Sequence, residues 1–384
     1  MKPIQWAKNE MPKTEDSQLK VMALDEIKKA RTFHESFPQY STTPLAKLNN
    51  MASYLGLKEL YVKDESYRFG LNAFKVLGGS FAMAKYIAKQ TNKDVSELPY
   101  KVLTSDKLRE EFGQATFFTA TDGNHGRGVA WAANRLKQKA VVFMPKGSTK
   151  TRFDNIAKEN ATVTIEEELR CFFEDTAWDG YEEIPAWIMQ GYGTMAMEAT
   201  EQLNEDGCDR PTHVFVQAGV GSLAGAVTGY FTNRYPENPP KIVVAEAAAA
   251  ACLYKGAAAK DGKIRIVEGD LETIQAGLAC GEPNTISWDI LKNHVTVFAA
   301  CPDWVSTKGM RLLAAPFKGD PQVISGESGA VPTGLLASIM EMEEYKDLKD
   351  YLQLDENSRV LVFSTEGDTD PDRFKEIVWE GKEY

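Results

Sequence analysis

Short apolar segments with strand character alternate with helical segments through most of the chain. Residues 60–62, 115–120 and 140–145 have the length and the apolar, β-branched or aromatic content of buried strands, and a stretch with helical spacing of apolar residues follows each of them. Such alternation is typical of parallel sheets, because the return from one parallel strand to the next needs a crossover helix. The sequence therefore predicts an α/β fold with mostly parallel sheets.

The second half of the chain continues the pattern, with strands expected at 212–217, 242–245, 295–299 and 360–363 and helices at 183–203 and 331–345. A chain of 384 residues is too long for one simple core, so we expect two three-layer α/β domains. In this prediction residues 1–80 and 200–384 form the large domain, residues 81–199 form a smaller, mobile domain, and the active site lies in the cleft between them.

A further helix is expected to begin at Pro44. The preceding Thr43 supplies a hydroxyl for the N-cap, and proline is favoured at the first helical position.

Composition excludes some classes of partner. Asp and Glu outnumber Lys and Arg by 55 to 44, and the net charge of −11 argues against nucleic acid and anionic membranes. No apolar run approaches the roughly 20 residues of a membrane span, and the N-terminus lacks a signal-peptide core, so we expect a cytoplasmic protein.

The five cysteines are scattered along the chain, which favours reduced thiols and leaves open one disulfide pair among the last three cysteines.

Lys75 stands where a lysine can act as a nucleophile. It follows the strand at 60–62 through Asn72-Ala73-Phe74, and it begins a helix whose apolar residues from Leu77 to Ala88 repeat at the spacing of one buried face. The partial positive charge of a helix N-terminus disfavours an ammonium, so the free amine becomes more available. The position suits a lysine that forms a Schiff base.

A glycine-rich turn, Gly219-Val220-Gly221-Ser222-Leu223, follows the strand at 212–217 and opens the next helix. Such glycines let backbone N–H groups approach a phosphate, and the helix N-terminus favours its negative charge. The turn also fits the G-x-G-x-x-A pattern of dinucleotide-binding folds, with Glu246 at about the distance of a ribose-binding acid. The turn thus predicts a phosphate site and leaves a nicotinamide-dependent oxidoreductase open as an alternative.

Two polar groups follow other strands. The loop Thr121-Asp122-Gly123-Asn124-His125 offers several N–H donors, so we expect it around a substrate carboxylate, with Asp122 able to transfer a proton and His125 in a structural role. Ser364 ends the strand at 360–363, where its hydroxyl could bond a ring nitrogen without protonating it.

Taken in order, these segments resemble the fold-type II pyridoxal-phosphate (PLP) enzymes, the tryptophan synthase β-like family. Asn72-Ala73-Phe74-Lys75 is similar to its Schiff-base motif, Asp122 to Gly126 to its loop for the substrate carboxylate and cofactor oxygen, Gly219 to Leu223 to its phosphate cup, and Ser364 to its pyridine-nitrogen partner. Longer stretches resemble, within this family, the ammonia-lyases that act on 2,3-diaminopropionate: residues 175–181, 184–192, 276–284, 325–330 and 364–370.

The resemblance implies a reaction: elimination of D- and L-2,3-diaminopropionate to pyruvate and two ammonia molecules, with pyridoxal 5'-phosphate on Lys75. It implies that Phe74, Lys75, Asn124, the turn from Gly219 to Leu223 and Ser364 bind the cofactor, whereas Thr121, Asp122, Gly123, Asn124 and His125 bind the substrate carboxylate. Lys75 is then the base for the L-isomer and Asp122 for the D-isomer, and Asp122 and Asp175 are the candidate acids for the leaving amine. It further implies a small amino-acid substrate and a homodimer, and we assign no metal ligands.

The chain departs from the family at one point. Only nine residues, 166–174, join the strand at 161–165 to Asp175, and they cannot hold the helix and return strand that the family carries there. Two alternatives remain besides the oxidoreductase. A serine or threonine dehydratase or a β-replacing synthase would keep every cofactor residue, and a PLP-binding protein without turnover would follow if the short segment spoils the cleft.

Overall fold

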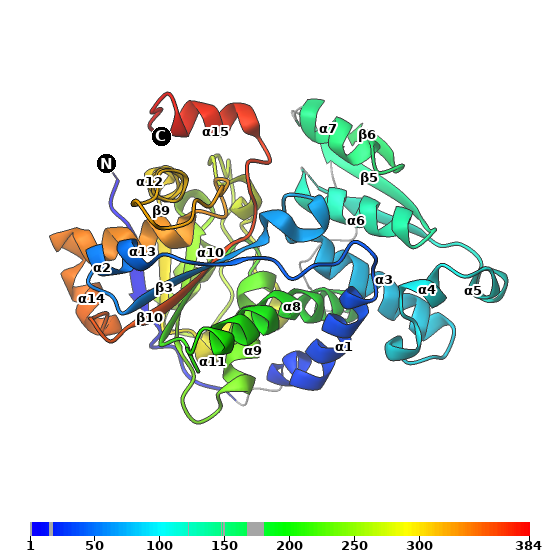
Figure 1. Cartoon of the computed structure of the whole chain (residues 1–384), viewed down its shortest axis with the longest axis horizontal. Helices are drawn as coiled ribbons and strands as arrows, with labels where there is room; N and C mark the ends of the chain where they lie inside the picture. The colour runs from blue at the N-terminus through cyan, green and yellow to red at the C-terminus, as the bar shows by residue number, and fades with distance from the viewer. Residues whose placement is uncertain (1, 15–17, 122, 147, 149, 167–179) are drawn as a thin grey trace.

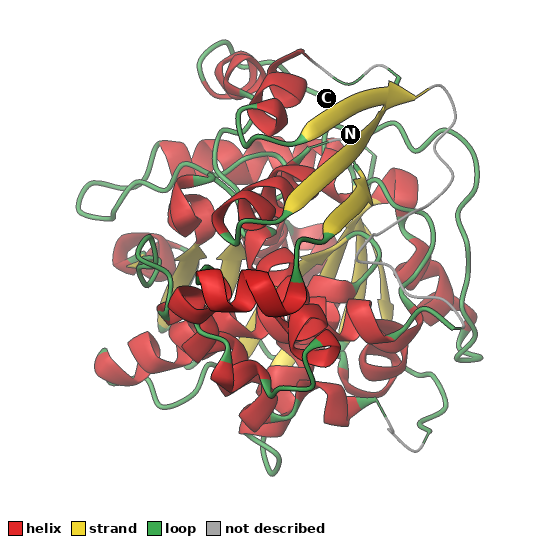
Figure 2. Cartoon of the chain, turned by 90° about the vertical axis from the view of Figure 1, so that its right-hand side faces the viewer, coloured by secondary structure: helices red, strands yellow, loops and turns green. Residues whose placement is uncertain are grey.

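The computed structural model describes the chain except residues 1, 15–17, 122, 147, 149 and 167–179. Figure 1 shows a large α/β body at one end of the molecule and a smaller group of elements at the other, with both termini on the large body. Figure 2 shows the three strands of the smaller group lying apart from the larger sheet behind them.

The larger sheet has seven strands in the order β1-β9-β8-β7-β10-β3-β2, and its central strands are parallel while the edge strands β1 and β2 run antiparallel to their neighbours. Its strands are β1 (Gln5–Lys8), β9 (Val297–Cys301), β8 (Lys241–Ala247), β7 (His213–Ala218), β10 (Arg359–Ser364), β3 (Glu59–Asp64) and β2 (Leu45–Lys47).

Helices bury both faces of this sheet, so neighbouring strand residues enter different cores. Val214 and Val216 of β7 belong to one core, and Phe215 between them belongs to the other, all with 0% exposure. The first core is built with α1 (Leu24–Glu35), α3 (Val76–Gln90), α8 (Glu183–Glu205), α9 (Ser222–Arg234) and α11 (Thr285–His294). The second is built with α2 (Asn49–Tyr54), α12 (Asp303–Ala314), α13 (Val331–Glu341), α14 (Lys346–Leu352) and α15 (Pro371–Val378). In the described part of the chain, no helix is long and apolar enough to cross a membrane.

The smaller sheet has three parallel strands, β4 (Thr116–Ala120), β5 (Lys139–Pro145) and β6 (Thr162–Glu166), in that order. Its crossovers are α6 (Asn124–Arg135) and α7 (Lys150–Ala157), and α6 packs against α3. The α/β class with mostly parallel sheets is confirmed, and the expected strands are placed within two residues of those observed. The division into domains and the mobility of the smaller one stay predictions.

The helix expected at Pro44 is wrong. Residues Leu45–Lys47 instead form the edge strand β2, and the carbonyl of Pro44 accepts a hydrogen bond of 2.9 Å from the N–H of Asp64. The Thr43 hydroxyl does not cap a helix; it donates to the buried carboxylate of Glu65 at 2.6 Å. Pairing with β3 and the need of a buried carboxylate for donors outweigh the local preference for a helix start.

A buried group of ions ties the segment after β3 to α8. Lys63 of β3 and Arg68 of the short helix η2 (Glu65–Gly70) each donate to Glu198 of α8 at 2.8 Å, and Arg68 also donates to Glu65 at 2.8 Å. The side chains of these four residues are 0% exposed. Burial alone would raise the pKa of Glu198, but the charges of Arg68 and Lys63 outweigh burial and hold that pKa below its usual value. The Glu198 carboxylate therefore stays charged. Together, Lys63, Glu65, Arg68 and Glu198 form the Glu198 ion cluster, which holds η2 and the start of the lysine loop (residues 71–75) against α8.

Changing Glu198 to Ala should lower the free energy of unfolding by about 3–5 kcal/mol, because Lys63 and Arg68 would stay buried without the carboxylate that they share. Urea denaturation followed by circular dichroism measures this loss. Glu201→Ala is the matched control, because the side chain of Glu201 lies on the same helix and is 54% exposed. Equal losses in the two variants would contradict the role of the cluster.

Candidate active site

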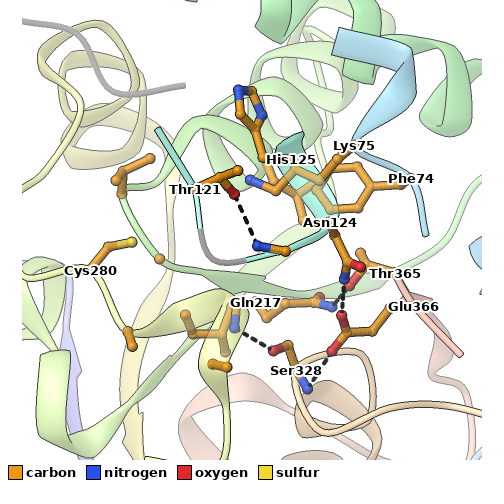
Figure 3. Close-up of a pocket in the computed structure, with 18 of the residues that line it drawn as sticks. Phe74, Lys75, Thr121, Asn124, His125, Gln217, Cys280, Ser328, Thr365 and Glu366 are labelled. Carbon is orange, nitrogen blue, oxygen red and sulfur yellow. Dashed lines mark hydrogen bonds between the residues drawn. The ribbon is translucent and has the colours of Figure 1, made fainter. Parts of the chain in front are cut away.

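A cavity of about 390 Å³ opens where the loops after β4, β7 and β10 meet the start of α3. Its volume lies within the usual range of small-molecule sites. Figure 3 shows Lys75 and His125 on one side of the cavity and Gln217, Thr365, Glu366 and Ser328 on the other. The lining also includes the turn 219–223, the loop 276–280, Thr369, Pro145 and Arg152.

Backbone pairing holds the lysine loop in place. Ala73 forms an antiparallel bridge with Glu366, and the N–H of Phe74 donates to the carbonyl of Thr365 at 3.1 Å. Lys75 caps the N-terminus of α3, as the sequence predicts, and its Nζ lies 5.5 Å from the centre of the Phe74 ring and 5.9 Å from that of Tyr192. The loop after β10 thus sets the position of Lys75, and two aromatic rings lie near its amine.

A glycine brings the loop after β4 close to the lysine. A Cβ at Gly128 of α6 would lie 2.8 Å from the backbone nitrogen of Val76 and 3.1 Å from the carbonyl carbon of Lys75. Since real side chains do not tolerate such contacts, only glycine lets α6 pack this closely on the start of α3. The N-terminus of α6 therefore lies beside Lys75.

Four of the residues predicted for the substrate carboxylate come together there. Thr121, Gly123, Asn124 and His125 all line the cavity. The N–H of Gly123 donates to Thr121 Oγ1 at 3.2 Å, and Asn124 begins α6 and donates from Nδ2 to Glu366 Oε2 at 2.6 Å. The end of a twelve-residue helix with adjacent hydroxyl and amide groups is suited to a carboxylate.

The turn from Gly219 to Leu223 also lines the cavity along its whole length. Gly221 adopts a left-handed φ of 100°, and a Cβ there would lie 2.8 Å from Ser287 Oγ. The buried Asn284 fixes the turn, because its Nδ2 donates to Ser222 Oγ at 2.9 Å and its N–H donates to the carbonyl of Val220 at 2.7 Å. With α9 starting at Ser222, the turn and the helix N-terminus have a geometry that suits a phosphate.

Thr365, and not Ser364, lines the cavity. Ser364 is 1% exposed, does not line the cavity, and donates to Ser325 Oγ at 2.8 Å. Thr365 lines the cavity, and its Oγ1 accepts a hydrogen bond of 2.6 Å from Gln217 Nε2. The role of Ser364 stays a prediction, and Thr365 is a second hydroxyl to consider for it.

Glu246, the acid of the dinucleotide alternative, has a structural task. It is 1% exposed and does not line the cavity. Its carboxylate accepts hydrogen bonds from the N–H groups of Leu253 and Tyr254, at 2.8 and 2.6 Å, in the first turn of α10 (Cys252–Ala259). Burial raises the pKa of Glu246 to about 8. A carboxyl group committed to a helix end in the core does not offer a ribose site in this cavity.

Two glutamates that sequence reasoning missed, Glu327 and Glu366, line the cavity. They lie within the stretches 325–330 and 364–370 that carry the family resemblance, but no local pattern separates them from other acidic residues. Glu327 is 7% exposed; burial and the charge of Glu366 raise its pKa to about 7, although Arg373 Nε lies 3.7 Å away. The cavity therefore holds a carboxyl group that titrates near neutral pH.

Asp122 and Asp175 lie outside the described residues, as does most of the short segment 166–174. Among the residues that are described, no group of three or more His, Cys, Asp or Glu side chains is placed to hold a metal ion. None of the cysteines in that part of the chain is in a disulfide; they are Cys208, Cys252, Cys280 and Cys301.

Replacing Glu327 with Gln should change how stability depends on pH. The folded pKa of about 7 lies above the usual 4.5, so between these values the folded protein keeps a proton that the unfolded chain has lost. In the wild type the Glu327 carboxyl therefore lowers the free energy of unfolding as pH rises from 4.5 to about 7, by up to about 1.4 kcal/mol per pH unit.

Urea denaturation at pH 5, 6, 7 and 8 checks the Glu327 prediction. The variant should gain stability over the wild type as pH rises, whereas Glu343→Gln, a change at a side chain that is 89% exposed, should follow the wild type. Parallel curves for Glu327→Gln and the wild type would refute the raised pKa.

Comparison with known proteins agrees with this geometry. Residues 37–363 match the family model described as "Pyridoxal-phosphate dependent enzyme". The chain is 49% identical over 367 residues to diaminopropionate ammonia-lyase of Salmonella typhimurium, covering 91% of each chain. The crystal structure of holo diaminopropionate ammonia lyase from Escherichia coli superposes with a TM-score of 0.89 at 41% identity, covering 99% of this chain and 97% of that one. The same Escherichia coli enzyme in complex with D-serine gives a TM-score of 0.90 at 42% identity, with 99% and 98% covered.

Proposed function

The chain belongs to the diaminopropionate ammonia-lyases of the pyridoxal-phosphate-dependent enzyme family, and we propose how the residues of its cavity carry out that activity. The activity is the PLP-dependent elimination of 2,3-diaminopropionate, which with one water gives pyruvate and two ammonia molecules. One observation carries the assignment of the site: a lysine at the start of a helix and a glycine cradle line the same cavity.

The cavity fits the cofactor. The turn 219–223 lines the cavity with the glycine geometry that suits a phosphate, and Asn124 and Thr365 add polar groups to the same cavity. When bound, pyridoxal phosphate supplies an aldehyde that joins amines and a ring that takes up electrons from the α-carbon. We assign the phosphate to residues 219–223, the ring to Phe74, Asn124 and a hydroxyl at Ser364 or Thr365, and the aldehyde to Lys75.

The same residues orient the substrate. We assign the α-carboxylate to the N-terminus of α6, with Thr121, Gly123, Asn124 and His125. Because Gly128 lets α6 pack against the start of α3, a carboxylate bound there would direct the α-carbon toward Lys75. Phe74 and Tyr192 place aromatic rings near the lysine amine and limit the water around it. Lys75 Nζ can then exchange a proton with the α-carbon of a held substrate.

Two aspartates complete the proposal. The L- and D-isomers present the α-proton on opposite faces, so one base cannot serve both; we assign the L-isomer to Lys75 and the D-isomer to Asp122. The β-amine leaves as ammonia only when it is protonated, and Asp122 and Asp175 are the candidate proton donors.

Full turnover of both isomers by the Asp122→Asn variant would exclude a proton-transfer role for Asp122.

The purified protein should release pyruvate and ammonia from diaminopropionate with a kcat/KM at least about tenfold above that for the deamination of D-serine, L-serine or L-threonine. The reason is that serine and threonine carry a hydroxyl in place of the β-amine, so a site that binds the β-amine loses its contact with that amine. A lactate dehydrogenase-coupled assay measures the 2-oxo acid that each compound releases: pyruvate from diaminopropionate and serine, and 2-oxobutyrate from threonine. Faster turnover of serine or threonine would favour a dehydratase. Bound cofactor without release of ammonia from any amino acid would favour a non-catalytic binding protein.

Replacing Lys75 with Ala should remove the visible absorption band of the cofactor-loaded protein that borohydride abolishes, and should lower turnover by at least about 10³-fold, because both the covalent attachment and a proton-transfer group are lost. Absorption spectra before and after borohydride, with Lys85→Ala on the same helix as control, measure the first effect. A reducible band that persists in Lys75→Ala would refute the attachment at Lys75.

We also propose the organisation implied by the family resemblance: a cytoplasmic homodimer in which residues 1–80 and 200–384 form the large cofactor-binding domain and residues 81–199 a smaller, mobile one. The seven-stranded sheet, built from residues 5–8, 45–64 and 213–364, and the three-stranded sheet, built from residues 116–166, support this division. Sedimentation velocity of the holoenzyme tests the dimer; a monomer across the working concentration range would exclude it.

A further inference from the structure

Glu366 joins three loops that line the cavity. Its backbone forms the bridge with Ala73 in the lysine loop, and its carbonyl accepts a hydrogen bond of 2.9 Å from the N–H of Gly326. Its side chain accepts from the N–H of Ser328 at 3.0 Å through Oε1, and from Asn124 Nδ2 at 2.6 Å through Oε2. Figure 3 shows its carboxylate between Ser328 and Asn124.

The surroundings leave Glu366 little freedom to move. It is 7% exposed, and Cβ atoms at Gly326 and Gly329 would lie 3.1 Å from its Cγ and 2.9 Å from its backbone oxygen. The next residue is held as well, because the N–H of Gly367 donates to the carbonyl of Asn72 at 3.0 Å. The carboxylate therefore has a fixed position relative to both Lys75 and Asn124.

A carboxylate can only accept hydrogen bonds, whereas an amide has a donating and an accepting end. With Glu366 beside it, Asn124 must direct Nδ2 at the carboxylate, since its oxygen there would face two negative oxygens. The amide plane is then fixed, and the second N–H of Nδ2 is left to donate in a defined direction. A charged acceptor makes this preference stronger than a neutral one would.

We propose that Glu366 is a positioning residue that fixes the direction in which the Asn124 amide donates toward the cofactor, an inference that rests on the proposed function. It does not touch the reacting atoms in this role. The hydroxyl oxygen on the cofactor ring would accept a hydrogen bond from an N–H of Asn124 and would be repelled by its carbonyl oxygen. Glu366 holds the lysine loop through its backbone and Asn124 through its carboxylate, so it fixes Lys75 and Asn124 relative to each other.

The test is a double-mutant cycle on cofactor affinity. Glu366→Gln replaces one oxygen with an NH₂ group, which can donate to the oxygen of Asn124 and turn its amide over. We expect Kd for pyridoxal phosphate, titrated into the cofactor-free protein by tryptophan fluorescence, to rise about tenfold in Glu366→Gln and by a similar factor in Asn124→Ala. The double variant should bind no more weakly than Asn124→Ala, because Glu366 acts through Asn124.

A matched control is Glu246→Gln, which changes another buried glutamate that accepts two hydrogen bonds but lies outside the cavity lining; its Kd should equal that of the wild type. If Glu366→Gln does not fold, as judged by near-ultraviolet circular dichroism, Glu366→Asp replaces it in the cycle, since it keeps the charge but withdraws it from Asn124. An unchanged Kd in the Glu366 variant, or an equal added loss in the Asn124→Ala background, would overturn the inference. A wild-type protein that binds no pyridoxal phosphate would instead overturn the proposed function.

Discussion

The parallel hydrogen bonding of β7, β10 and β3 decides where the chemistry of this protein is placed. The carboxyl ends of parallel strands lie at one edge of a sheet, and β10 pairs with β3 on one side and β7 on the other. The glycine turn follows β7, Thr365 and Glu366 follow β10, and the chain to Lys75 follows β3. Groups from distant parts of the sequence therefore meet at a single cavity without any local signal that links them.

Buried carboxyl groups in the core and at the cavity differ in how closely they are paired with cations. The Glu198 ion cluster is fully buried and closely paired, which keeps the Glu198 carboxylate charged and holds η2 against α8. At the cavity, burial and the charge of Glu366 raise the pKa of Glu327 to about 7, and its partner Arg373 is 3.7 Å away. A carboxyl group whose pKa lies near neutral can change its charge, whereas a carboxylate held between two cations keeps its charge.

Patterns carried by neighbouring residues were predictable from the sequence. The strands, the start of α3 at Lys75 and the turn before α9 follow from apolar spacing, helix starts and glycines, each of which acts over a few residues. The helix expected at Pro44 was wrong because pairing with β3 and the carboxylate of Glu65, both supplied by other parts of the fold, outweighed a good local helix start. Glu246 fitted a spacing rule, but the structure commits it to the end of α10.

The sequence by itself determined the α/β class, the helix start at Lys75 and the glycine turn before α9, since these depend on the order and kind of adjacent residues. Only the tertiary structure decided that Thr365 lines the cavity while Ser364 bonds Ser325, that Gln217 holds Thr365, and that Glu366 joins Asn124 to the lysine loop. The physical reason is that side-chain direction at a strand end and hydrogen bonds between distant loops are set by sheet register and by the close approach of helices. Both depend on how the whole chain packs.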